Sequence, residues 1–243
     1  YVEHSTEEIG TESLGDTLKL LTQDLTGNRV FKSKKSDELY TMTENAGVVN
    51  TGSVRVEGAR NSETGALSTI DAGGHSMLEV SDEGASAEYK NVKITNTDIT
   101  DGSVLNISGA DGSATFSNYV EIDTAEGING IVNNGTLTLN NNAYVASNTG
   151  IAGDGTLNLN GGSALNLTGG ASIEQNTINL AGGRITLDTG DVTAFDINMR
   201  NGNLTLGDEG VLTANLLDVT SGKVYVTADN LHADVNLHHY NST

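Results

Sequence analysis

The second half of the chain repeats a short pattern every 19 to 21 residues, and this period limits the possible folds more than any other feature. Each unit holds an alternating strand, a turn that contains glycine and a second alternating strand. A fixed period of this length, with one short strand-turn-strand unit per repeat, indicates a chain that coils and stacks on itself. The first apolar positions of successive units are Leu137, Leu157, Ile178, Ile197 and Leu217.

Each unit contains two further apolar positions. Because residues i and i+2 of a strand point to one face, the apolar residues of each strand can all face inward. Three inward faces per turn of about 20 residues predict an all-β, triangular parallel β-helix with three strands per rung. A four-stranded propeller blade needs roughly twice this period, and the LxxLxLxxN register of leucine-rich repeats is absent. The second strand follows at Leu165, Ile185, Leu204 and Val224, and a weaker third at Ile151, Ile173, Val192, Val211 and Leu231.

The composition agrees with a solenoid. The chain has 30 Gly and no Pro, Cys or Trp. Glycine supplies the positive φ of tight corners, whereas proline would delete a ladder hydrogen bond in every rung it entered. Asparagine tolerates left-handed corners and can form amide ladders between stacked rungs. The absence of cysteine excludes a disulfide scaffold and cysteine-ligated structural zinc.

The formal charge is −20, which argues against nucleic acid and anionic membranes as partners, because these need a basic stripe. Basic residues cluster in the sequence at Arg29, Lys32, Lys34 and Lys35, which we interpret as a solvated loop or a docking site. The acidity would suit solubility or calcium binding, but the GGxGxDxUx nonapeptide of calcium-binding β-rolls is absent.

The chain divides by pattern into a short cap and a long solenoid. Residues 1–45 are predicted to be an N-terminal cap, partly helical, because leucines recur at helical spacing over 13–25. Residues 46–243 are predicted to be the β-helix, with irregular rungs over 46–126 and regular rungs over 127–243. Turn-forming segments such as NSETG (61–65) predict protruding loops in the irregular part, where binding would concentrate.

The sequence holds only incomplete matches to the motifs of known enzyme families. No G-x-S-x-G is present, and the string Asn96-Thr97-Asp98 matches pectin-hydrolysing β-helix enzymes without the rest of their signature. Pairs of carboxylates, Asp188 with Asp208 or Glu209 with Asp229, could lie on adjacent rungs as a glycosidase would require. From residue 127 on only three residues are basic, too few for a β-helix lyase. We therefore predict no enzymatic activity, no cofactor and no metal site.

The segments GTLTLNN, GDGTLNLNGGSALNL and GNLTLGDEG, within 135–210, resemble the passenger regions of bacterial autotransporters, the type V secreted surface proteins. The resemblance extends more weakly over 46–243. It implies a right-handed parallel β-helix, exported through the outer membrane to the cell surface or the medium by a C-terminal barrel. It also implies adhesin, self-association or stalk functions, with a minority of enzymes.

Our leading hypothesis is a non-enzymatic adhesion or self-association module that binds through a solenoid face or through the loops. Its partners would be copies of itself on neighbouring cells or a host glycan or protein surface, with no insertion into the membrane by this part. A glycan-depolymerising enzyme of lyase or tailspike type and a passive stalk are the alternatives. The chain starts at Tyr1 and is expected to be a processed or excised fragment. Because sugars bind on ring faces, the candidate contacts are Tyr89, Tyr119 and Tyr144.

Overall fold

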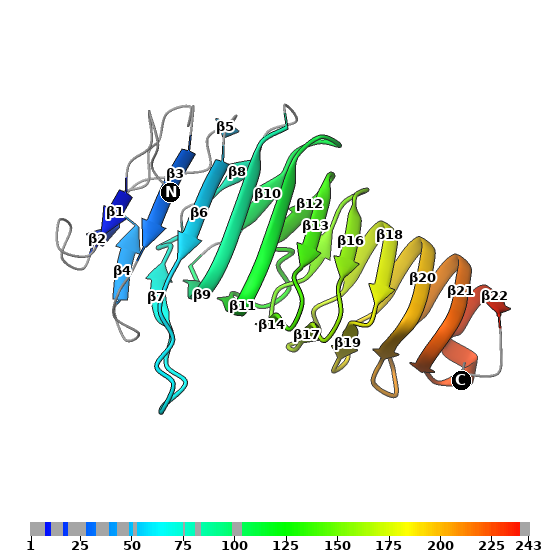
Figure 1. The fold of residues 1–243 in the computed structure, drawn as a ribbon. Coiled ribbons are helices and arrows are strands. Elements are labelled where there is room, and N and C mark those ends of the chain that lie inside the picture. Colours follow the sequence, from blue (N-terminus) through cyan, green and yellow to red (C-terminus); the bar gives the residue numbers. More distant parts are fainter. Residues whose placement is uncertain are drawn as a thin grey trace.

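The computed structural model is a three-sided rod of stacked strands, and this confirms the predicted all-β parallel β-helix (Figure 1). It describes residues 53–74, 76–80, 84–98 and 104–238, together with five short strands before residue 51. Side chains are described from residue 55 on. Every pairing between the named strands is parallel, so the chain returns to each side once per turn.

The three sides, called here the first, second and third face, each form one ladder, and six long strands bend round corners. These six are β9 (Ser86–Asn96), β11 (Ser113–Thr124), β18 (Ile173–Ala181), β20 (Val192–Thr205), β21 (Leu212–Tyr225) and β22 (Leu231–Leu237). Four of them serve two faces, whereas β20 and β21 serve all three. The first face also holds β1 (Glu8–Gly10), β3 (Asn28–Lys32), β6 (Ser53–Glu57), β13 (Thr136–Leu139) and β16 (Thr156–Leu159). The second also holds β2 (Thr17–Leu18), β4 (Leu39–Met42), β7 (Ser68–Asp71), β14 (Tyr144–Ser147), β17 (Ala164–Leu167) and β19 (Arg184–Leu187). The third also holds β5 (Val49–Asn50), β8 (Glu79–Val80), β10 (Leu105–Ile107), β12 (Ile131–Asn133) and β15 (Ile151–Ala152).

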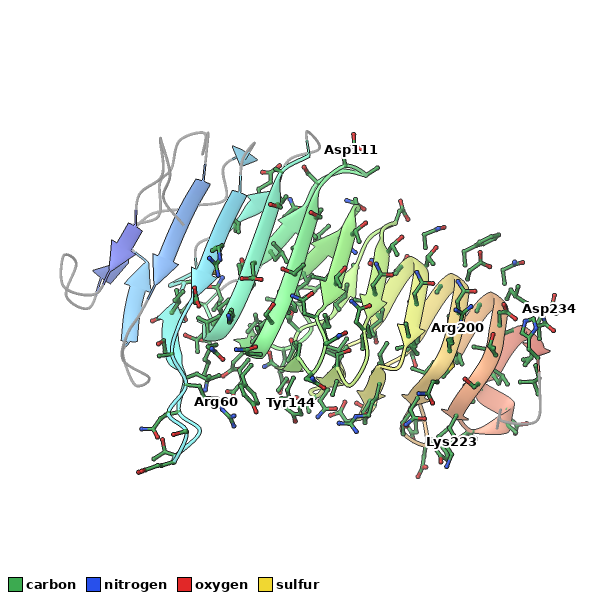
Figure 2. The ribbon with its side chains drawn as sticks, viewed as in Figure 1. Arg60, Asp111, Tyr144, Arg200, Lys223 and Asp234 are labelled. Carbon is green, nitrogen blue, oxygen red and sulfur yellow. The ribbon has the colours of Figure 1, made fainter. Side chains whose placement is uncertain are left out.

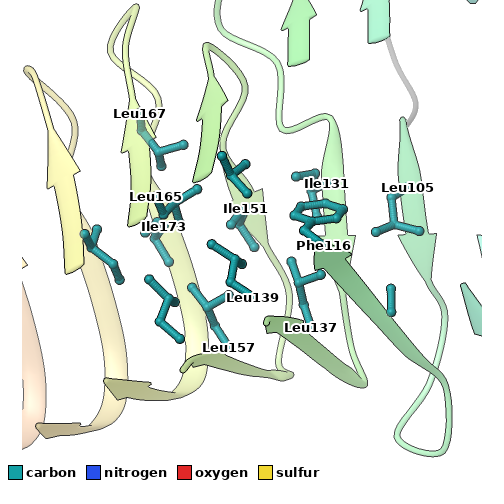
Figure 3. Packing of buried hydrophobic residues seen from close by; sticks show 14 of the residues in the cluster. Leu105, Phe116, Ile131, Leu137, Leu139, Ile151, Leu157, Leu165, Leu167 and Ile173 are labelled. Atoms are coloured by element: carbon teal, nitrogen blue, oxygen red, sulfur yellow. The ribbon is translucent and has the colours of Figure 1, made fainter. Parts of the chain in front are cut away.

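The regular rungs follow the predicted register. Leu137, Leu157, Ile178, Ile197 and Leu217 pair in turn and are all buried. Figure 3 shows how leucines and isoleucines from successive rungs stack in the narrow interior. Burial of each such side chain contributes about 1.5–3 kcal/mol, so the stack stabilises the rod along its length.

One predicted inward position is wrong. Val192 pairs with Leu212, which is fully buried, whereas Val211 lies one residue earlier at the corner and is half-buried. The sequence offers two adjacent apolar residues there, and the period could not choose between them. From the last residues of β21 onward the interior opens, since Val224 and Leu231 are only partly buried. A short 3₁₀ helix (Ala228–Asn230) lies between β21 and β22.

The earlier rungs are longer and less even, as predicted. Val54 pairs with Ala87, 33 positions later, and Ala87 pairs with Ala114, 27 positions later. Part of the extra length forms a protruding loop, residues 58–67, which runs from β6 to β7 and is closed by an antiparallel bridge between Arg60 and Leu67 (Figure 1). This is the loop that the NSETG segment predicts. Two further segments also predict loops. SDEGAS (81–86) lies partly outside the described residues, and SGADGS (108–113) forms the turn between β10 and β11.

The corner between the first and second faces, called here the first corner, turns at a left-handed residue in each rung from β9 to β21. Asparagine holds several of these positions because its short amide tolerates positive φ, which confirms the predicted role of this residue. The side-chain amides also form a ladder on the first face, where Asn179 donates to Asn158 at 2.9 Å and Asn198 donates to Asn179 at 3.0 Å. The left-handed corner residues are Asn91, Asn118, Asn142, Gly162, Gly182, Asn201 and Gly222.

The first 45 residues differ from the prediction where they are described. Thr17 and Leu18 lie inside the predicted helix over 13–25, but they form strand β2 and pair with β4. Arg29 and Lys32 belong to strand β3 and not to a loop. The rest of 13–25, with Lys34 and Lys35, lies outside the described residues. Whether this part caps the solenoid therefore stays a prediction.

Candidate ligand-binding cleft

Two of the three predicted tyrosines meet on the second face. Tyr119 of β11 pairs directly with Tyr144 of β14, so their rings stand next to each other on adjacent rungs. The ring centroids are 6.5 Å apart and the planes are tilted by 46°. Tyr144 is 40% exposed, and its hydroxyl oxygen accepts a hydrogen bond from the Asn166 amide at 2.7 Å. The pair offers ring surface to solvent in a chain with only 4% aromatic residues.

The protruding loop adds a cation to this pair. The guanidinium carbon of Arg60 lies 3.3 Å from the centre of the Tyr119 ring, in the geometry of a cation–π contact. The tip of the loop is ordered locally, since the Asn61 side-chain oxygen accepts from the backbone of Glu63 and Thr64. Its base is held by Ser68, whose hydroxyl accepts from the backbone of Ala59 at 3.0 Å. The loop is therefore anchored at both ends above the second face.

The loop and the tyrosines enclose a hollow of about 280 Å³. Two ring faces, one cation and one carboxylate lie around an apolar floor, and such a mixture suits a small, partly polar ligand. Figure 2 places Arg60 and Tyr144 near each other on the same side of the rod. The hollow is lined by Arg60, Gly65, Leu67, Tyr119, Val120, Glu121 and Tyr144.

Tyr89 is not a surface contact, which corrects the third prediction. It is 1% exposed, stacks on Phe116 at 5.6 Å and donates its hydroxyl to the carbonyl of Val104 at 2.8 Å. Burial raises the pKa of its phenol far above the usual value, so the side chain stays neutral. Strand β9 alternates from Ala87, which faces inward, and Tyr89 follows two residues later. That alternation was the signal that could have placed it correctly.

Sequence reasoning did not identify Arg60 as part of a site. The segment NSETG predicts a loop, but the period cannot say that the loop would bend back over Tyr119. Contacts between a loop and a rung 59 positions later depend on the three-dimensional path.

Asp188 was named above as one of a possible pair of catalytic carboxylates, but in the structure its carboxylate binds backbone N–H groups at a corner. Desolvation tends to raise its pKa, but backbone N–H groups of Thr189, Gly170 and Gly169 bind the carboxylate and lower the pKa overall. The distances are 2.6, 3.3 and 2.9 Å respectively. A carboxyl group with a lowered pKa stays ionised and is a poor general acid at neutral pH.

The NTD string is also structural at its first residue. Asn96 is fully buried, and its side-chain oxygen accepts a hydrogen bond from the backbone of Gly74 at 2.8 Å. Within the described ranges, no group of three or more His, Asp or Glu side chains is placed to hold a metal ion. In that same part of the chain, no helix is long and apolar enough to span a membrane.

Searches with the whole chain against models of protein families, against curated proteins and against solved structures gave no significant match.

Proposed function

We propose that this protein is a non-enzymatic adhesion module of a bacterial cell surface that binds carbohydrate in the cleft of Arg60, Tyr119 and Tyr144. The observation that carries the proposal is the pairing of two outward tyrosines under a loop that supplies a cation. The exposed Tyr144 ring can pack against the C–H face of a sugar, while Arg60 covers the Tyr119 ring, and the Arg60 and Glu121 side chains can bind hydroxyl groups. The autotransporter resemblance of 135–210 supports the surface location.

A shallow cleft binds a single ligand weakly, and a cell-surface module offsets this low affinity by being present in many copies. Many copies on one cell face many copies of a glycan on another surface, so weak contacts add up to strong attachment. Attachment through many weak contacts does not require that any covalent bond be made or broken.

The test measures binding of the purified chain to a panel of surface polysaccharides by calorimetry and on a glycan array. Tyr144→Ala and Arg60→Ala should each weaken binding about tenfold, which corresponds to about 1.4 kcal/mol. The matched control is Phe195→Ala, because Phe195 is 57% exposed at the corner between the third and first faces, away from the cleft. Equal losses in Tyr144→Ala and Phe195→Ala, or no loss in either, would exclude the cleft.

The same panel separates adhesion from the enzymatic alternative. A glycan-depolymerising enzyme would release reducing ends or unsaturated products from at least one polymer during the binding experiment. A passive stalk would bind none of them. Both outcomes are read from the same samples.

Self-association is a second candidate, and the last rung favours it. Val235 and Leu237 pair in register with Leu217 and Val219, which are buried, yet they are themselves about half exposed. Sedimentation of the wild type and of Val235→Asp with Leu237→Asp would test this candidate. A concentration-dependent dimer that the double variant loses would support it, and a monomer at high concentration would exclude it.

A further inference from the structure

The described cations fall into two groups that differ in their partners. Three of them form ion pairs on the first and second faces: Arg55 with Glu57 and Glu88, Lys90 with Glu57, and Lys93 with Glu121. Four others, Arg60, Arg184, Arg200 and Lys223, have no carboxylate within 4 Å in the described part of the chain. In a chain of formal charge −20, four cations that escape pairing are unexpected.

The four unpaired cations all belong to the first corner. Arg60 lies in the loop that leaves this corner, Arg184 and Lys223 start the second face on their rungs, and Arg200 ends the first face. Arg184 pairs with Asn203 and Asn203 pairs with Lys223, so these cations stand two rungs apart, about 10 Å. Tyr144 belongs to the same column two rungs before Arg184, through Ala164. The corner thus continues the cleft along the rod.

Carboxylates avoid this corner. The described chain from residue 127 on holds ten carboxylates and three cations, yet the residues between the two faces are Asn, Gly, Ser, Thr and Ala beside those cations. Figure 2 shows Arg60, Tyr144 and Lys223 along one side of the rod, Asp111 on the opposite side and Asp234 at the C-terminal end. Charges more than about 8 Å away are screened at physiological salt. A ligand on the corner therefore meets a locally positive surface.

A second hollow of about 300 Å³ lies beside Arg200. The amide ladder of Asn179 and Asn198 forms one wall, and Asp218 and Thr220 belong to the next rung. The amides, the Thr220 hydroxyl and the Asp218 carboxylate can bind hydroxyl groups of a ligand, and Arg200 can bind a carboxylate of the same ligand. The hollow lies across the first corner from the column of Arg184 and Lys223, so one extended chain could contact both.

We infer that the first corner binds a single-chain acidic polysaccharide, whose carboxylate or sulfate groups contact Arg184, Arg200 and Lys223 in succession. This inference rests on the proposed carbohydrate-binding function and extends it to the class of ligand. The cations lie along the two edges of one corner, Arg184 and Lys223 on the second face and Arg200 at the end of the first, which fits a flexible single chain of repeated acidic sugars. A duplex or an anionic membrane presents a broad negative surface to the whole rod, and the acidic faces repel it.

The test compares polygalacturonate, hyaluronate and heparin with neutral dextran of similar length. The variant R184Q/R200Q/K223Q is set against a matched control, R55Q/K90Q/K93Q, which changes the formal charge equally but removes cations that are already paired. We expect at least one acidic polymer to bind more tightly than dextran. The corner variant should lose about tenfold in affinity for that polymer and show a weaker dependence on salt. The control should lose less than about threefold.

The outcomes separate this inference from the proposed function. If dextran binds as well as the acidic polymers and Tyr144→Ala weakens both, the cleft stands and the acidic ligand is excluded. Equal losses in the corner variant and its control also exclude it, because net charge alone would then explain them. Tighter binding of a short DNA duplex or of phosphatidylserine vesicles than of every acidic polymer would overturn it as well. If the wild type binds none of the polymers, the proposed carbohydrate-binding function itself is contradicted. Thermal melting of each variant checks that the fold is intact.

Discussion

The regular and irregular rungs share one pattern of strand pairing but differ in the number of residues per turn and in the loops that the additional residues form. From Leu137 to Leu217 the register advances by 19 to 21 residues, and nearly all of each turn is strand or tight corner. Between Val54 and Ala87 it advances by 33, and the surplus includes the loop that carries Arg60 to Tyr119. The regular rungs place residues in straight columns, whereas the long turn supplies a contact that crosses rungs.

This difference has a thermodynamic reason. Lengthening a surface loop costs little, because the entropy of closure rises only slowly with length. Changing an inward position costs much more, because its neighbours above and below are close-packed. A solenoid can therefore vary its corners while keeping its interior, and the candidate cleft lies where such variation occurs.

The largest expected effect is in the regular interior. Leu157 is fully buried between Leu137 and Ile178, so Leu157→Ala should lower the free energy of unfolding by about 2–5 kcal/mol. The matched control is Phe195→Ala, since Phe195 is 57% exposed on a neighbouring rung and should change stability little. Urea denaturation followed by circular dichroism measures both. A small effect of Leu157→Ala would mean that the regular rungs are not the rigid part.

A smaller effect is expected where the protruding loop begins. A Cβ added to Gly58 would lie 2.8 Å from the Cβ of Ser68 and would overlap the carbonyl oxygen of Asn91. Gly58→Ala must therefore shift the loop or the rung below it, at about 1–3 kcal/mol, and should weaken ligand binding through Arg60.

Gly161→Ala is the matched control for Gly58→Ala. Gly161 also lies at the first corner, but an added Cβ has no neighbour closer than 4.0 Å there. Melting temperature and binding to the polymer panel are measured on both variants. If Gly58→Ala keeps full affinity, the position of the loop does not matter for the cleft.

Most of the fold could be predicted from the sequence because the positions of the interior residues repeat at a fixed spacing along the chain. A strand alternates, a corner needs a left-handed residue, and both recur with the period, so Leu157, Ile178 and Ile197 were placed correctly. The rule failed where two neighbouring residues satisfied it equally, as at Val211 and Leu212. It also failed at Thr17–Leu18, where leucine spacing suggested a helix and pairing with β4 gives a strand.

The candidate cleft could be predicted only in part. Tyr119 and Tyr144 are outward because of strand alternation, and their pairing follows from a register of 25 residues that the irregular sequence does not reveal. The same alternation directs Tyr89 inward, against the prediction. The corner cations were visible as three isolated residues, but their common position depends on the register of three rungs. Composition alone pointed to Arg29 and its neighbours instead.

Tyr89 allows a test of the irregular interior that is independent of binding. Tyr89→Phe keeps the stack on Phe116 but leaves the buried carbonyl of Val104 without its donor, which should cost about 1 kcal/mol. Because burial raises the pKa of Tyr89, its contribution is fully present below pH ~10 and declines at higher pH, where the unfolded phenol ionises. The variant should therefore lose less stability than the wild type between about pH 10 and 11. Identical alkaline profiles would show that the irregular rungs admit solvent to this ring.

The smallest effect concerns Asp188, at the corner between the second and third faces of a regular rung. Its lowered pKa means that the ionised carboxylate stabilises the fold above pH ~4, and that this stabilisation is lost as the pH falls below that value. Because the side chain is exposed, Asp188→Asn should cost only about 0.5 kcal/mol at pH 7 and nothing near pH 2. Asp208→Asn, on the next rung, is the matched control for the loss of one negative charge. The midpoint of urea denaturation is measured for the wild type and for both variants from pH 2 to 7. If Asp188→Asn costs the same at both ends of this range, the backbone donors of Gly169 and Gly170 bind an amide as well as a carboxylate. The corners of the regular rungs would then depend on shape, and charge would matter only at the first corner.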